Sequence, residues 1–174
     1  MIIMDNFLPD NVWREFCKKK HWEEPHTSFF RYDTQPSSFF NQVSLQIWKW
    51  YTKKYNPSGV VGIETWTNRT YNEDSIPLPW HCDRDEQHYR ETGENLHPIC
   101  GIVLYGHETL PEGAYLEIER KHGNEFIEPV PNRLILFDPS IHHRVTPMHG
   151  GYRYTMASNL WNRELKPWRG EWTS

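Results

Sequence analysis

Trp80-His81-Cys82-Asp83 and Ile141-His142-His143-Arg144-Val145-Thr146-Pro147 are the two stretches that decide the fold, and Arg153 follows the second by about ten residues. Side chains alternate faces along an extended strand, so His81 and Asp83 are expected to point the same way. A histidine and a carboxylate from one segment, completed by one histidine from another, form the face that holds non-haem Fe(II) and leaves other coordination positions open. The two stretches therefore predict a metal site shared by two β segments.

Length and composition are those of one globular unit. The chain has 174 residues, with 37% hydrophobic residues and an aromatic content of 15%. A chain of this length is expected to form a single domain around one core. Within it we expect helical support over residues 1–58, a β core over 59–160 and a tail over 161–174.

Charge and cysteine content exclude several classes of protein. The formal net charge of −4 gives no general electrostatic reason to bind nucleic acid. The three cysteines are too few and too scattered for a disulfide framework or a thiolate zinc site. The sequence contains no signal peptide pattern and no run of eighteen apolar residues. We therefore expect a soluble, cytoplasmic protein without a membrane segment.

The order of elements predicts a mainly β fold of the α+β class with helices outside the strands. A short strand is expected at Ile2–Met4, followed by helices over 9–20 and 38–55. Eight short segments rich in Val, Ile, Tyr, Trp and Thr follow, and they are predicted as strands over 60–67, 79–83, 99–105, 113–119, 124–129, 133–137, 142–147 and 151–160. Strands of this number and length favour a closed or double-sheet structure.

Between the second and third of these strands lies the longest polar segment, Arg84–His97. It leaves the segment that carries His81 and Asp83, and it contains a glycine. Such a loop is suited to covering or recognising a ligand, although a passive connection has the same composition.

Two residue choices follow from strand alternation. His142 and His143 lie on opposite faces of an extended segment, so only one of them can point inward, and spacing alone does not choose between them. Arg153 and Thr155 share one face of the last strand. If that face is buried, the Arg153 guanidinium needs a partner, which is either an acidic side chain or a bound carboxylate held by its fork of donors.

These stretches resemble a known family, the 2-oxoglutarate/Fe(II)-dependent oxygenases, and are most similar to its prolyl-hydroxylase-like branch. The resemblance covers nearly the whole chain and rests on the motifs His81-Cys82-Asp83, Asn132-Arg133-Leu134-Ile135-Leu136-Phe137, His143-Arg144-Val145-Thr146-Pro147 and Gly151-Tyr152-Arg153-Tyr154-Thr155. The opening Ile3-Met4-Asp5-Asn6-Phe7-Leu8-Pro9 is similar to the start of domains in this branch. The resemblance implies a double-stranded β-helix, or jelly-roll, core.

The resemblance also implies roles for individual residues. The family's distal histidine stands two residues before a valine and four before a proline, which selects His143, so His81, Asp83 and His143 would be the Fe(II) ligands. Arg153 matches the arginine that pairs with the far carboxylate of 2-oxoglutarate, and Thr155 matches a hydroxyl that some members place beside it. An inner-strand tyrosine often assists in the family, and Tyr105 and Trp66 are both candidates.

The implied activity is that of a dioxygenase. By resemblance, 2-oxoglutarate and O2 are co-substrates, succinate and CO2 are released, and a C–H bond of a prolyl peptide or a small molecule is hydroxylated. Asp83 fills the position that a halide would need, so hydroxylation is expected rather than halogenation. A non-catalytic, cupin-like module that binds metal or a small acid is the alternative. Demethylation of nucleic acid by the same chemistry would need a basic surface, which the net charge argues against.

Overall fold

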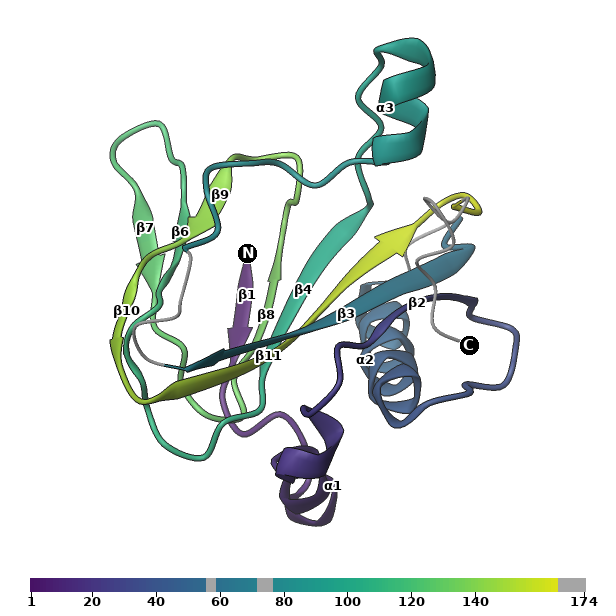
Figure 1. Cartoon of the computed structure of the whole chain (residues 1–174). Coiled ribbons are helices and arrows are strands. Elements are labelled where there is room, and N and C mark those ends of the chain that lie inside the picture. Colours follow the sequence, from purple (N-terminus) through teal and green to yellow (C-terminus); the bar gives the residue numbers. More distant parts are fainter. Residues whose placement is uncertain (56–58, 72–76, 166–174) are drawn as a thin grey trace.

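The computed structural model describes residues 1–55, 59–71 and 77–165. Two layers of antiparallel strands face each other, and the helices lie mostly against the outer side of the larger layer (Figure 1). None of the helices in the described residues combines the length and apolar character needed to cross a bilayer.

The larger layer is a six-stranded antiparallel sheet. Its strands, in spatial order, are β1 (Ile2–Met4), β8 (Leu134–Phe137), β4 (Cys100–Tyr105), β11 (Tyr152–Trp161), β3 (Gly62–Tyr71) and β2 (Thr27–Arg31). β11 pairs with β3 over its full length and with β4 on its other edge. β11, the last strand of the described residues, is therefore central, between strands that are distant in sequence.

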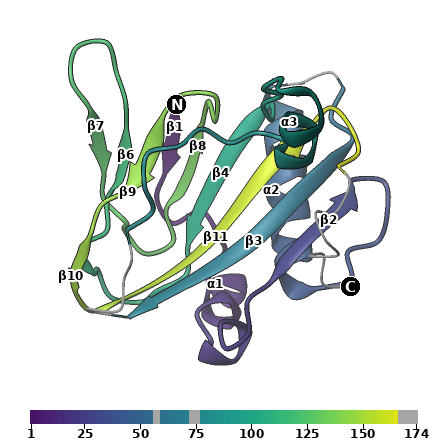
Figure 2. The same ribbon diagram turned by 45° about the horizontal axis from the view of Figure 1, so that its top comes forward.

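The smaller layer consists of short strands on the opposite side of the barrel. One group contains β7 (Glu125–Ile127), β6 (Leu116–Ile118) and β9 (His143–Val145), and the other pairs β10 (Met148–Gly150) with β5 (Glu112–Gly113). The two views agree that these strands face β8, β4 and β11 across the interior of the protein (Figures 1 and 2).

The large sheet separates two clusters of buried side chains. On its outer face lies α2 (Phe39–Tyr55), whose buried Phe40, Val43 and Ile47 recur with the helical period and pack in the same cluster as Met156 of β11. The inner face of the sheet packs against the smaller layer, with Ile135 among the fully buried residues there. Strand alternation thus sends every second residue of β11 into the barrel interior.

The structure changes several of the predicted elements at the N-terminal end. The helix expected over 9–20 is shorter, with α1 at Asp10–Phe16 followed by the 3-10 turn η1 at Lys19–His21. β2 was not predicted and extends the sheet beside β3, which is longer than the 60–67 segment expected. The predicted tail began at residue 161, but Trp161 is the last residue of β11. Residues 166–174 of that tail lie outside the described residues.

The segment around His81 and the polar loop after it also differ from expectation. Residues 79–83 do not form a strand, because only His81 makes a β bridge, to His143. The Arg84–His97 loop contains the helix α3 (Glu86–Thr92), which projects beyond the end of β4 (Figure 1). The Asp85 side chain accepts a hydrogen bond from His88 N–H at the start of α3, and Gly93 ends it with φ +79°. The expected 113–119 strand is divided into β5 and β6.

Packing of α2 against the sheet predicts how the fold responds to a cavity. Ile47 is 0% exposed, so replacing Ile47 with Ala should lower the free energy of unfolding by about 2–5 kcal/mol. The matched control is Gln46→Ala, because Gln46 is exposed on the same helix and should change stability by less than about 0.5 kcal/mol. Urea unfolding followed by circular dichroism measures both, and equal effects of the two substitutions would contradict this packing.

Candidate active site

His81 and His143 face each other across a β bridge between two segments that are far apart in sequence. His81 N–H donates to the His143 carbonyl at 3.0 Å, and His143 N–H donates to the His81 carbonyl at 2.8 Å. Directly opposed residues of an antiparallel pair project their side chains on the same side of the sheet. The bridge therefore brings the two imidazoles together, with ring centroids 4.3 Å apart.

Both imidazoles are held in the tautomer that leaves Nε2 free. The Nδ1 atom of His81 lies 2.8 Å from the Pro79 carbonyl, and the Nδ1 atom of His143 lies 2.9 Å from the Ile141 carbonyl. A carbonyl oxygen can only accept, so each Nδ1 must carry the proton. The Nε2 lone pairs then remain available to a metal, which is how ligating histidines are usually oriented.

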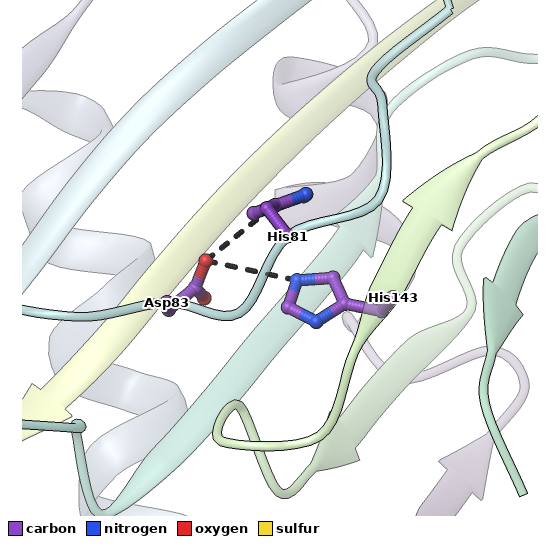
Figure 3. A group of neighbouring side chains, drawn as sticks. All are labelled: His81, Asp83 and His143. Atoms are coloured by element: carbon purple, nitrogen blue, oxygen red, sulfur yellow. Dashed lines mark ion pairs between the residues drawn. The ribbon is translucent and has the colours of Figure 1, made fainter. Parts of the chain in front are cut away.

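Asp83 completes a compact group of three potential ligands. Its Oδ1 atom lies 3.5 Å from His81 Nε2 and 3.6 Å from His143 Nε2 (Figure 3). One ligand atom from each of the three residues lies within 4.8 Å of the other two. Ligands about 2.1 Å from a first-row metal, at right angles, lie about 3 Å apart. The group is therefore close to the spacing of one face of an octahedron.

The electrostatics of the group favour an ionised carboxylate. Burial alone would raise the pKa of Asp83, but the attraction of the His143 and His81 imidazoles in their protonated form outweighs it and holds that pKa well below its usual range. Burial lowers the pKa of His81, but the Asp83 carboxylate and the Pro79 carbonyl together raise it more, so the net shift is upward. A divalent cation would replace the proton that the carboxylate stabilises.

The structure distinguishes the two neighbouring histidines that the sequence left open. The His143 side chain is 6% exposed and points at Asp83, whereas the His142 side chain is 58% exposed and pairs with Glu119 at 3.1 Å. The Phe137 ring packs edge-on against the His143 ring, with centroids 4.8 Å apart. His143 is therefore the inward member of the doublet.

The triad opens into a cavity of about 450 Å³ between the two layers. His81, Asp83 and His143 line it together with Arg153 and Thr155. The sequence-predicted site residues, which come from segments more than sixty residues apart, thus meet around one cavity. A concave site with a few convergent polar groups is typical of small-molecule binding.

Arg153 and its neighbours offer hydrogen-bond donors that the described residues do not use. Arg153 is 7% exposed, yet its Nε atom has no hydrogen-bond partner in the part of the chain that the structure describes. The same is true of the buried hydroxyls of Thr155 and Tyr105. Buried donors without partners are costly, by about 1–3 kcal/mol each, and they commonly indicate a missing ligand. Three such donors suit a carboxylate, which can only accept.

Tyr105 is the inner-strand tyrosine nearest to this arginine. It lies directly across from Thr155 in the β4–β11 pair, and the Arg153 guanidinium carbon lies 5.4 Å from its ring centroid. Burial raises the pKa of Tyr105, and the Arg153 charge partly offsets this. The hydroxyl is therefore protonated and able to donate. Trp66, the other candidate, lines the cavity opposite Ala157.

Residues Glu64 and Asn159 also face the barrel interior, and sequence reasoning did not select them. Asn159 is six positions beyond Arg153 on β11, and the same alternation that selected Thr155 would have selected it. Glu64 lies directly opposite Asn159 on β3. That pairing depends on the register of two distant strands, so no local signal identifies it.

Three-dimensional comparison finds the same fold in solved structures. A prolyl-4-hydroxylase from Pseudomonas putida matches with a TM-score of 0.69 at 16% identity, covering 93% of this chain and 92% of that one. A prolyl hydroxylase from Trichoplax adhaerens, solved with a hypoxia inducible factor peptide fragment, matches with a TM-score of 0.62 at 13% identity, covering 92% and 83%. The chain has the fold of the 2-oxoglutarate/Fe(II) oxygenases.

A further match within this fold is HygX from Streptomyces hygroscopicus, solved with iron bound. It gives a TM-score of 0.61 at 10% identity and covers 92% of this chain and 81% of that one. No protein-family model matches the sequence, and no curated protein matches it. The predicted α+β class with an antiparallel jelly-roll core is confirmed, and the oxygenase fold carries the His-x-Asp and distal His pattern that the resemblance predicted.

The doublet allows a matched test of the metal centre. Replacing His143 with Ala should weaken binding of Co(II) or Fe(II) by at least about a hundredfold, because one of three ligands is lost. His142→Ala should leave metal affinity within about twofold, because its ring is exposed and directed at Glu119. Anaerobic calorimetric titration measures both constants, and equal losses in the two variants would reject the assignment of His143.

Proposed function

We propose that this protein is a Fe(II)- and 2-oxoglutarate-dependent dioxygenase that hydroxylates a C–H bond and releases succinate and CO2. The observation that carries the proposal is the meeting of two features in one cavity. A His81–Asp83–His143 triad whose Nε2 atoms face one another lies there with the buried Arg153 and Thr155, and the Arg153 Nε atom and the Thr155 hydroxyl have no hydrogen-bond partner among the described residues.

In this proposal His81, Asp83 and His143 hold the iron. Two neutral imidazoles and one carboxylate are the donor set of the facial triad. Iron bound there, with 2-oxoglutarate and O2, would supply the oxidation of the substrate C–H bond. The backbone carbonyls of Pro79 and Ile141 fix the two imidazoles, so the ligand atoms need little rearrangement when metal binds.

The proposed role of Arg153 is to bind the far carboxylate of 2-oxoglutarate. A guanidinium offers parallel donors in a fixed plane, which match the two oxygens of a carboxylate. Thr155 and Tyr105 would add hydroxyl donors from the same side. A bound carboxylate would thereby satisfy three buried groups and compensate the charge of a buried cation.

Apolar side chains are proposed to keep this region dry. Val103, Ala157 and Phe137 line the cavity between Arg153 and the triad. Exclusion of water strengthens the electrostatic interactions of the bound dicarboxylate and protects reactive species from side reactions. Asp83 also fills the ligand position that a halide would need, so the proposed outcome is hydroxylation.

The substrate is proposed to be a prolyl or other peptide, or a small molecule. Support for a peptide comes from the similar Trichoplax enzyme, which was solved with a peptide fragment. HygX, solved with nickel and 2-oxoglutarate, supports the proposed co-substrate. We further propose that residues 1–174 act as one domain and that the protein works in the cytoplasm. Its three cysteines are all free, which agrees with a reducing compartment.

The central experiment is an anaerobic titration with Fe(II) and 2-oxoglutarate. Chelation of the metal by the 2-oxo acid should produce a visible charge-transfer band, and admission of air should then release succinate. Asp83→Ala should abolish both signals because a ligand is lost. A protein that binds metal without the band and forms no succinate would instead be a non-catalytic, cupin-like module.

A second experiment tests the proposed carboxylate anchor. Arg153→Met should raise the dissociation constant for 2-oxoglutarate roughly a hundredfold, since loss of a buried charged partner costs about 3 kcal/mol. Arg31→Met is the matched control, because Arg31 is exposed on β2 and pairs with Asp33 and Glu164. Affinity is measured from the charge-transfer band, and an unchanged constant in Arg153→Met would refute this role.

A further inference from the structure

Inward-facing side chains of the large sheet form successive rows across its strands. Thr155 pairs with Tyr105 in a row next to Arg153, and Ala157 pairs with Val103 and Trp66 in the row after it. Successive inward positions on a strand are about 6.8 Å apart. The rows thus change from hydrogen-bond donors to apolar groups along β11.

The next row contains Glu64 and Asn159 and runs to the metal triad. Glu64 of β3 pairs with Asn159 of β11, Asn159 pairs with Gly101 of β4, and Gly101 pairs with Phe137 of β8. The Phe137 ring contacts the His143 ring, with centroids 4.8 Å apart. The row is therefore at the triad end of the interior, away from Arg153.

Glu64 is a largely enclosed carboxyl group, and no cation of the described residues is among the groups that shift its pKa. Its Oε2 accepts a hydrogen bond from the Trp161 indole at 3.0 Å. The pKa of Glu64 is raised to about 7, mainly by burial and further by the negative charges of Asp83 and Asp85, while the Trp161 indole and the Asn159 amide lower it in part. No lysine or arginine of the described residues is among these influences. A buried carboxylate without a cation is unfavourable unless a ligand supplies the charge.

Asn159 supplies an independent indication of a missing ligand. It is 3% exposed, and its Oδ1 atom has no hydrogen-bond partner among the described residues. Its amide donates toward Glu64, so the free oxygen is an acceptor beside a second acceptor. A site whose available groups all accept hydrogen bonds is complementary to a donor, and most strongly to a charged one.

We propose that Glu64 and Asn159 form a subsite for a protonated amino or guanidinium group of the substrate. The inference rests on the proposed function and deepens it, because it assigns the substrate class as cationic. Arg153, which lines the cavity, would hold 2-oxoglutarate on the far side of the apolar row from Glu64, so the substrate would approach the metal from the Glu64 side. The acceptors there select a nitrogen cation and disfavour carboxylates.

The test uses the Trp161 indole as a reporter, because its N–H donates directly to Glu64. Nitrogen-15-labelled protein is loaded with Zn(II) and 2-oxoglutarate, which allows no turnover, and the indole signal is identified from its loss in Trp161→Phe. We expect n-butylammonium and methylguanidinium to shift this signal saturably, and n-butanol to leave it unshifted. The relative affinities of the two cations identify which nitrogen group the subsite prefers.

Glu64→Gln provides the matched variant. A glutamine can still accept from Trp161 and can donate to Asn159, so the variant should fold with an unfolding temperature equal to or above that of the unsubstituted protein. Its affinity for the cations should fall at least tenfold. Glu86→Gln, an exposed acid on α3, should retain full affinity.

The outcomes separate this inference from the proposed function. Metal and 2-oxoglutarate uptake is measured first, and its absence would overturn both. Uptake followed by equal shifts with n-butanol and n-butylammonium, or by unchanged cation affinity in Glu64→Gln, would overturn the cationic subsite alone. Asn159→Leu is the second variant, and retention of full affinity in it would also count against the subsite.

Discussion

The structure around the cavity depends on the pair of backbone hydrogen bonds that His81 and His143 exchange. These bonds are the only β bridge of the segment that carries His81 and Asp83 within the described residues, and they join it to the smaller layer. Because the two histidines are directly opposed, the bonds fix the relative position of the imidazoles as well as of the backbones. Asp83 is then positioned by its N–H, which donates to the Pro139 carbonyl at 2.9 Å. The spacing of the triad therefore depends on backbone pairing.

β11 connects this site to the stability of the fold. Its outer face contributes Met156 to the core beneath α2, while its inner face carries Arg153 and Thr155. Each buried donor without a partner reduces stability by about 1–3 kcal/mol. Burial of large side chains such as Ile47 against the outer face offsets such losses. One strand thus positions polar groups in the cavity because its other side is held by apolar packing.

Strand alternation predicted more of the site than of the fold. It placed His81 and Asp83 on one side although residues 79–83 are not a regular strand, because extended backbone alternates even without a continuous ladder. It could not choose between His142 and His143, since that choice depends on the register of β9 against β6, where His143 pairs with Ile118. The family pattern made the choice instead.

The helix α3 was not predicted because seven residues are too few to show helical periodicity. Only Asp85, which caps its start, and Gly93, which ends it, indicate the helix in the sequence. β2 has no local signal that separates it from a loop, because its strand character comes from pairing with β3.

Hydrogen-bond donors and acceptors are concentrated at opposite ends of the protein interior. Donors gather around Arg153 at one end, and acceptors gather around Glu64 at the other, with the triad near the acceptors. A dicarboxylate and a cation would each be attracted to one end and repelled from the other, so the two reactants could not exchange places. Burial is the main reason why the pKa of Glu64 is raised, and the negative charges of Asp83 and Asp85 raise it further. A bound metal would neutralise part of the Asp83 charge, and the carboxylate of Glu64 would then be stabilised for a cationic substrate. Metal loading and binding of the proposed cationic substrate would then be coupled through the charges of Asp83 and Glu64.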